Sequence, residues 1–169
     1  MRAPLDVAGL LEYAVKSLGA KMKSERDLRM RLRDRAEPGE DGQAAIEAVM
    51  LKLKEYGYLS DERFAADFTR MRQENEKFGK RRVQQGLMQK GIAGETANAA
   101  LTAAYEDVDE VALAKAYVER KRMKKPENEK ETARAMRRLM GAGFSTKTVW
   151  KVLRGWGAEV EEVEVDESE

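Results

Sequence analysis

Residues 51–68 read LKLKEYGYLSDERFAADF, and this stretch ends one helix and begins another within a few residues. Gly57 stands where a helix end requires a positive φ, a conformation that glycine adopts without steric cost. Ser60 has the place of an N-cap, whose hydroxyl accepts a backbone N–H, and Leu59 can pack on Phe64 in the first turns of the next helix. The stretch therefore predicts two helices whose angle is set by the turn between them.

The same helix-ending pattern returns at Gly91 and at Gly143, 52 residues later. Each glycine has a leucine four positions before it and an apolar residue after it. Three apolar stripes with the i, i+3, i+4, i+7 spacing of a buried helix face recur at a similar interval. These stripes are Ile46, Val49, Met50, Leu53; Ala97, Ala100, Leu101, Ala104; and Val149, Val152, Leu153, Trp156. The sequence thus contains three copies of a unit of about fifty residues, which predicts stacked helical repeats.

The predicted fold is all-α, with nine helices and no strand. We expect three tandem three-helix, helix-turn-helix-like repeats that form an elongated curved molecule. The predicted boundaries are 1–59 for the first repeat, 60–107 for the second and 108–157 for the third, with an acidic, disordered tail over 158–169. Residues 37–42, which hold Pro38, Gly39 and Gly42, are predicted to be a loop.

The composition argues against several classes of protein. The chain has no cysteine and no histidine, so disulfides, thiolate metal sites, cysteine nucleophiles and the commonest general base are excluded. No run of eighteen apolar residues and no secretory apolar region is present, which predicts a soluble, unexported, cytoplasmic protein that does not enter a membrane. We expect a monomer without a cofactor, a bound metal or catalytic residues.

The charges are divided unevenly along the chain. Seven of the 31 acidic residues lie in 159–169, and the other 24 accompany all 32 Lys and Arg, which gives the body a net charge of +8. A basic body with an acidic tail suggests a polyanion or an acidic protein surface as partner, with the tail as a competitor. The predicted partner-binding residues are Lys80, Arg81, Arg82, Arg120, Lys121, Arg122, Lys124, Lys125, Arg137 and Arg138.

Two other kinds of site remain open at this stage. The acidic cluster Glu106, Asp107, Asp109 and Glu110 could bind Mg²⁺ in a nuclease, although negative charge at a helix start explains it more simply. The helix-turn-helix outline also allows binding to single- or double-stranded DNA through basic patches. The helix predicted at 95–104 has no Lys or Arg, whereas the last helix carries Lys147, Lys151 and Arg154 and would read DNA better.

Several of these stretches together resemble the RecX family of bacterial regulators of the RecA recombinase. The stretches are YGYLSDERFA at 56–65, GKRRV at 79–83, LMQKGI at 87–92, and Arg137–Leu139 and Gly143–Ser145 continuing to Val152 and Leu153. The resemblance covers the chain from about Leu10 to Leu153. The loop at 37–42, where the family has a tight glycine turn, and the acidic tail depart from the family pattern.

The resemblance implies a bacterial cytoplasmic protein of three tandem three-helix repeats without catalytic activity. Proteins of this family bind the filament of RecA on single-stranded DNA, in its helical groove and across neighbouring subunits. They impede the growth or persistence of the filament and restrain ATP hydrolysis, strand exchange and cleavage of the SOS repressor. The rival interpretation is a nucleic-acid-binding protein that sequesters single-stranded DNA directly.

Overall fold

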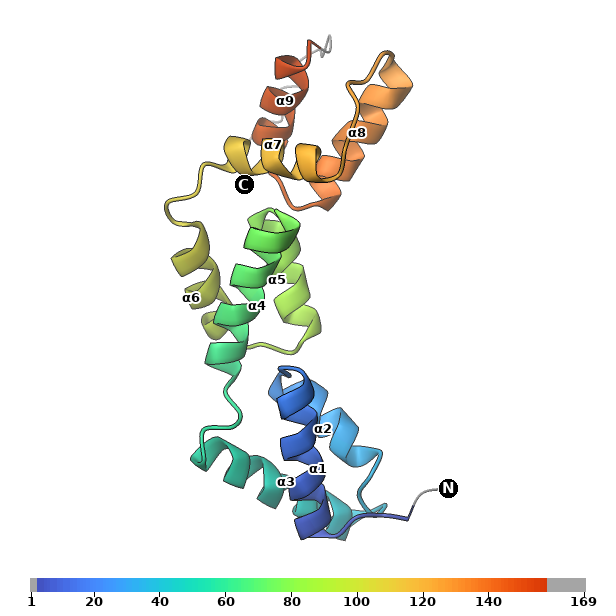
Figure 1. Cartoon of the computed structure of the whole chain (residues 1–169), viewed down its shortest axis with the longest axis vertical. Helices are drawn as coiled ribbons and strands as arrows, with labels where there is room; N and C mark the ends of the chain where they lie inside the picture. Colours follow the sequence, from blue (N-terminus) through green and yellow to red (C-terminus); the bar gives the residue numbers. More distant parts are fainter. Residues whose placement is uncertain (1–2, 158–169) are drawn as a thin grey trace, which may run out of the picture. The chain divides into compact units, whose positions relative to one another are not determined.

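The computed structural model describes residues 3–157, and within this range it holds nine α-helices and no strand (Figure 1). The helices are α1 (Val7–Ala20), α2 (Glu25–Arg33), α3 (Glu40–Glu55), α4 (Asp61–Glu76), α5 (Lys80–Gln89), α6 (Gly94–Tyr105), α7 (Glu110–Arg120), α8 (Glu129–Gly141) and α9 (Thr146–Gly155). The all-helical prediction is confirmed for these residues. The predicted acidic tail at 158–169 lies outside them.

The described chain divides into two compact units. Unit 1 comprises residues 3–69 and 85–103, and unit 2 comprises residues 70–84 and 104–157. The helices α4, α5 and α6 contribute to both units, and unit 2 is built from two separate stretches of the chain. The boundaries predicted for three repeats stay a prediction.

One hydrophobic cluster of unit 1 lies among α1, α2 and α3. Its fully or almost fully buried members are Leu10, Ala14, Leu28, Leu32, Ile46, Val49, Met50, Leu53 and Leu59. The stripe predicted around Ile46 is therefore the inner face of α3. Asp6 caps α1 by accepting the Gly9 N–H at 2.8 Å, and Ser24 caps α2 by accepting the Asp27 N–H at 3.2 Å.

The loop predicted at 37–42 is shorter than expected, because α3 already begins at Glu40. Gly39 precedes the helix with a φ of 100°. Gly42 lies in the first turn and is buried, and a Cβ placed on it would lie 1.7 Å from the Glu37 carbonyl oxygen. The glycine thus permits a close approach between the start of α3 and the preceding chain, where the sequence pattern predicted a loop.

The turn that the sequence places at Gly57 is present with the expected hydrogen bonds. The Tyr58 N–H donates to the Leu53 carbonyl at 2.9 Å and the Gly57 N–H to the Lys54 carbonyl at 3.0 Å, while Gly57 has a φ of 73°. This is the pattern of a glycine-ended helix. Ser60 then accepts the Arg63 N–H at 3.2 Å and begins α4. Both predictions for this turn are confirmed.

The core of unit 2 lies among α7, α8 and α9. It contains Ala114, Tyr117, Val118, Ala135, Leu139, Ala142, Phe144, Val149, Val152 and Leu153. The Phe144 ring meets the Tyr117 ring edge-on, with their centroids 5.8 Å apart. The stripe predicted on α9 is buried at its first three positions, and Trp156 packs against the core while partly exposed.

A residue with a strained backbone lies just beyond the end of helix α7. Arg122 has a φ of 49°, and the Met123 N–H donates to the Val118 carbonyl at 3.0 Å, as in the glycine-ended turns. We expect Arg122→Gly to raise the free energy of unfolding by about 1 kcal/mol, since glycine removes the steric cost of this conformation. Urea unfolding followed by circular dichroism measures the change. Arg122→Ala keeps the steric cost of the positive φ and serves as the control. An equal rise in the free energy of unfolding for both variants would contradict the explanation.

Candidate partner-binding surface

The positive charge of the body is concentrated in unit 2. Its described residues carry 19 Lys and Arg against ten Asp and Glu, a net charge of +9, whereas those of unit 1 carry 12 against 14, a net charge of −2. All ten residues predicted to bind a partner belong to unit 2. A charge of this size on one unit is the kind of field that attracts polyanions and acidic surfaces.

The first turn of α5 is held in unit 2 by a contact between two backbones. The Gly79 N–H donates to the Ala142 carbonyl at 2.8 Å. A Cβ on Gly79 would lie 2.4 Å from the Gly143 carbonyl oxygen, and a Cβ on Gly143 would lie 2.4 Å from the Arg82 backbone nitrogen. Two glycines therefore let the turn between α8 and α9 touch the start of α5, which carries the exposed side chains of Lys80, Arg81 and Arg82.

A second link in unit 2 is made by Glu110, the first residue of α7. Its carboxylate accepts the Ser145 backbone N–H at 2.9 Å, the Ser145 hydroxyl at 2.7 Å and the Thr148 hydroxyl. Ser145 in turn caps α9 by accepting the Thr148 N–H. Burial raises the pKa of Glu110, but the hydrogen bonds from Thr148 and Ser145 and the charge of Arg81 together hold it below its ordinary value.

Because the pKa of Glu110 is lowered in the folded protein, its carboxylate stabilises the fold above the unfolded pKa, and this stabilisation is lost as the pH falls through the folded value. We expect Glu110→Gln to lower the free energy of unfolding at pH 7 by about 1 kcal/mol, a figure reduced for the partial exposure of the group. Urea unfolding at pH 7 and at pH 3 should show the difference shrinking at the lower pH. Glu129→Gln removes an exposed carboxylate without an ion pair among residues 3–157 and is the control. A difference independent of pH would contradict this role.

The acidic cluster considered as a magnesium site is used within the fold. Asp109 caps α7 by accepting the N–H groups of Val111 at 2.9 Å and Ala112 at 3.1 Å, and Glu110 is engaged by Ser145 and Thr148. Among residues 3–157, no group of three or more Asp, Glu, His or Cys side chains is arranged to hold a metal ion. Two of the four residues of this cluster, Asp109 and Glu110, thus serve the start of α7 and its link to α9.

Some of the predicted cations have partners inside unit 2. Glu76 lies 3.9 Å from Arg120 and 4.0 Å from Lys121, so it partly neutralises the end of α7. The Lys121 ammonium also lies 5.9 Å from the centre of the Tyr117 ring, and the Arg82 guanidinium lies 5.8 Å from that of Phe78. These contacts orient the side chains of Arg120, Lys121 and Arg82, which keep their positive charges.

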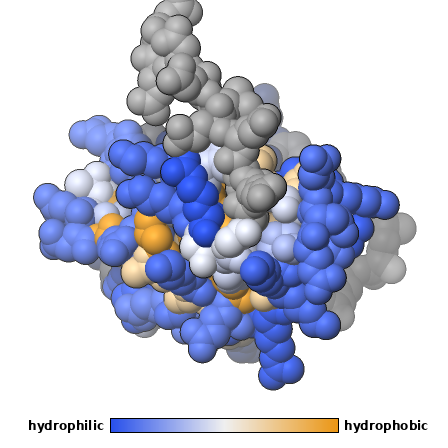
Figure 2. Space-filling model, turned by 90° about the horizontal axis from the view of Figure 1, so that it is seen from above, coloured by the Kyte–Doolittle hydropathy of each residue, from blue (hydrophilic) through white to orange (hydrophobic). Residues whose placement is uncertain are grey.

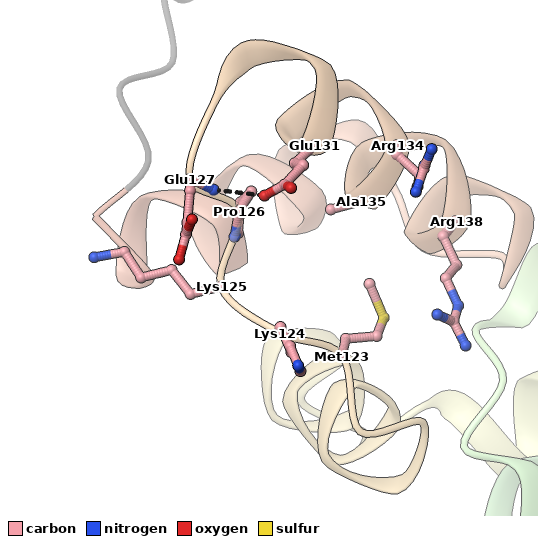
Figure 3. Close-up of a pocket in the computed structure, with 9 residues that line it drawn as sticks. All are labelled: Met123, Lys124, Lys125, Pro126, Glu127, Glu131, Arg134, Ala135 and Arg138. Atoms are coloured by element: carbon pink, nitrogen blue, oxygen red, sulfur yellow. Dashed lines mark hydrogen bonds between the residues drawn. The ribbon is translucent and has the colours of Figure 1, made fainter.

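Other cations surround a cleft of about 450 Å³ between the α7–α8 loop and α8 (Figure 3). Lys124 and Lys125 come from the loop, while Arg134 and Arg138 extend from α8. Met123 points into the space between them in Figure 3, and the backbone N–H of Glu127 donates to Glu131 at 2.9 Å. Within residues 3–157, none of these four cations is in an ion pair with a carboxylate. Glu127 and Glu131 also line the cleft, so its lining carries four positive and two negative side chains and has an excess of positive charge.

The structure brings part of the predicted set together and leaves part of it apart. Lys124, Lys125 and Arg138 share the cleft, whereas Arg137 does not line it. Arg134 does line it and was not among the predicted residues. The spacing of four between Arg134 and Arg138 places them on one side of a helix, and this spacing was the signal that could have found Arg134.

The exposed face seen in Figure 2 is mostly hydrophilic, with small apolar patches between the charged side chains. No helix among residues 3–157 has both the length and the apolar character needed to cross a bilayer.

These helices and the cations of unit 2 define an all-helical repeat protein with a cationic surface. A curated protein from Leptothrix cholodnii, named regulatory protein RecX, is 34% identical over 83% of this chain and 85% of its own length. Another of that name, from Escherichia coli, is 37% identical over 68% of this chain and 70% of its own. The chain belongs to the RecX family of regulatory proteins.

A family model agrees with this assignment, and a crystal structure shares the fold. The model described as the second three-helix domain of RecX matches residues 60–101. The crystal structure of RecX from Lactobacillus salivarius superimposes with a TM-score of 0.71 at 17% identity, covering 90% of this chain and 97% of that one. At this identity the likeness shows the fold alone, and it is the all-helical fold predicted from the sequence.

Proposed function

We propose that this protein is a non-catalytic, cytoplasmic regulator that binds the RecA filament on single-stranded DNA and inhibits its activities. The activities concerned are ATP hydrolysis, strand exchange and stimulated cleavage of the SOS repressor. Membership of the RecX family supports a regulatory role, and the resemblance of the sequence to that family supports RecA as the partner. The cationic unit 2 is the part of the molecule proposed to face the filament.

The observation that carries this placement is the separation of charge between the two units. A filament of recombinase on DNA presents phosphates and acidic side chains, and unit 2 with a net charge of +9 is suited to both. The exposed cations on α5, at the end of α7 and around the cleft would each meet a negative group. Several weak contacts made together give a strong attachment, because each contact raises the effective concentration for the next.

A pull-down tests the proposed partner directly. The tagged protein is incubated with RecA alone, with RecA and single-stranded DNA, and with RecA, DNA and a slowly hydrolysed ATP analogue. We expect retention of RecA to be strongest in the third mixture, where the filament is complete. Equal and negligible retention in all three mixtures would contradict the proposal.

A direct single-strand binder is the second candidate, and the cations of the cleft, which form no ion pair within residues 3–157, favour it. Four such cations can follow a phosphate backbone without contacting RecA. Inhibition of the RecA ATPase is measured with limiting and with large excess single-stranded DNA. A protein that sequesters DNA loses its effect in excess DNA, whereas one that binds the filament keeps it.

A further inference from the structure

The cleft between the α7–α8 loop and α8 lies beside the point where the acidic segment of the chain begins. Gly157 follows α9 with a φ of 73°, and its N–H donates to the Arg154 carbonyl at 2.8 Å. A Cβ on Gly157 would lie 3.4 Å from the ammonium nitrogen of Lys125. Lys125 is also one of the four cations around the cleft. The chain therefore leaves α9 at the edge of a basic cleft.

The residues that follow Gly157 have the composition that such a cleft favours. Residues 158–169 read AEVEEVEVDESE, with seven carboxylates and no Lys or Arg. Twelve residues reach at most about 40 Å when extended, which is ample for a cleft that starts at Lys125. From Glu162 to Asp166 acidic residues and valines alternate, so an extended segment presents carboxylates on one side and valines on the other.

We infer that the segment 158–169 is the occupant of the cleft, with its carboxylates on Lys124, Lys125, Arg134 and Arg138. The valines have an apolar surface to meet, because Met123, Pro126 and Ala135 also line the space. Since the segment is part of the same chain, it is present at a high effective concentration, about millimolar for a short tether. Occupation by the segment withholds these four cations from an outside polyanion. This inference goes beyond the proposed function and does not depend on it.

Carbodiimide crosslinking of the full-length protein tests the contact. The reagent joins a lysine amine to a carboxylate as an amide and takes up the released water as its urea, so it records pairs that already touch. We expect tandem mass spectrometry of the monomer to find segment carboxylates joined to Lys124 and Lys125 about tenfold more often than to Lys147 and Lys151, as expected for pairs held by a local field. Lys147 and Lys151 are exposed on α9, nearer in sequence, and are the internal controls. Even labelling of all four lysines would overturn the inference.

Two variants sharpen this measurement. Arg134→Gln with Arg138→Gln leaves both reporter lysines in place but removes two of the four cations that line the cleft, and should lower the crosslinking of these lysines several-fold. Lys115→Gln with Lys130→Gln removes two exposed charges of unit 2 that do not line the cleft. This pair should leave the crosslinking of Lys124 and Lys125 unchanged. In about 1 M NaCl, where the Debye length is about 3 Å, the preference for Lys124 and Lys125 should largely vanish. A preference that survives in the arginine variant would overturn the inference.

A binding measurement gives a readout independent of crosslinking. The seven acidic residues of the segment are changed to Gln or Asn in the full chain, and folding is checked by circular dichroism. We expect a fluorescent decaglutamate peptide to bind this variant about tenfold more tightly than the parent, because the cleft is open to it. Adding Arg134→Gln and Arg138→Gln should remove the gain, while adding Lys115→Gln and Lys130→Gln should not. If the gain in peptide affinity is the same with the arginine pair and with the lysine pair, the segment lies elsewhere and the inference is overturned.

Discussion

Replacing Gly143 with alanine is expected to destabilise unit 2 by about 3–4 kcal/mol, the sum of a strained backbone and a steric clash. Gly143 has a φ of 96°, which an alanine adopts at a cost. Its Cβ would also lie 2.4 Å from the Arg82 backbone nitrogen and 2.7 Å from the Gly79 carbonyl oxygen. Neither atom belongs to a flexible side chain, so the start of α5 must move away from the turn between α8 and α9.

Thermal and urea unfolding measure this loss, which corresponds to a fall in Tm of about 10 °C for a chain of this size. Gly141→Ala is a close control, because nothing lies within 4 Å of a Cβ there and the residue is helical. That change should be neutral or stabilising by up to about 1 kcal/mol. Gly79→Ala tests the same contact from its other side and should also destabilise. A Gly143→Ala protein as stable as Gly141→Ala would show that the two backbones do not touch in this way.

Reversing four charges on unit 2 is expected to abolish inhibition of the RecA ATPase. The variant carries Arg81→Glu, Arg82→Glu, Lys121→Glu and Arg122→Glu. Four contacts of about 0.7 kcal/mol each amount to about 100-fold in affinity, and the new carboxylates add repulsion to the loss. Helical content by circular dichroism should be unchanged, because all four side chains lie outside the buried core.

A matched control carries the same number of reversals elsewhere, at Lys115 and Lys130 of unit 2 and at Lys21 and Lys52 of unit 1. These lysines are exposed and lie outside the predicted set. Because Arg81 supports Glu110 and Lys121 lies near Glu76, a second version with Gln at the four positions separates loss of binding from loss of stability. Full inhibition by the folded four-residue variant, or equal loss in the control, would place the filament contact on another part of the protein.

Local signals in the sequence were sufficient where the deciding contacts span a few residues. The turn at Gly57 and the cap at Ser60 formed as predicted, since each depends on one conformation or one side-chain hydrogen bond within a helical turn. The loop predicted at 37–42 was too long because Gly42 was counted as a loop residue, whereas it lies in the first turn of α3. Its role is a close approach to Glu37 that shows only when α3 is in place.

The sequence did not predict the cationic cleft, although three of its four cations belong to the predicted partner-binding set. The loop cations Lys124 and Lys125 and the helix cation Arg138 stand out as charge runs, but nothing in a charge run says which members share one space. Arg134 joins them and Arg137 does not, because the rotation of α8 on its core residues decides which side chains face the loop.

The sequence by itself determined the helical class, the starts and ends of most helices, the buried stripes and the family, because these depend on periodicity and on contacts within one turn of the chain. The tertiary structure decided which distant groups meet. Gly79 touches Gly143, Glu110 reaches Ser145, and the cations of α5, α7 and α8 gather in one unit built from two separate stretches. Such pairs are separated by dozens of residues, and they come together only through the burial of apolar faces. The residues of an apolar face do not indicate which other face it packs against.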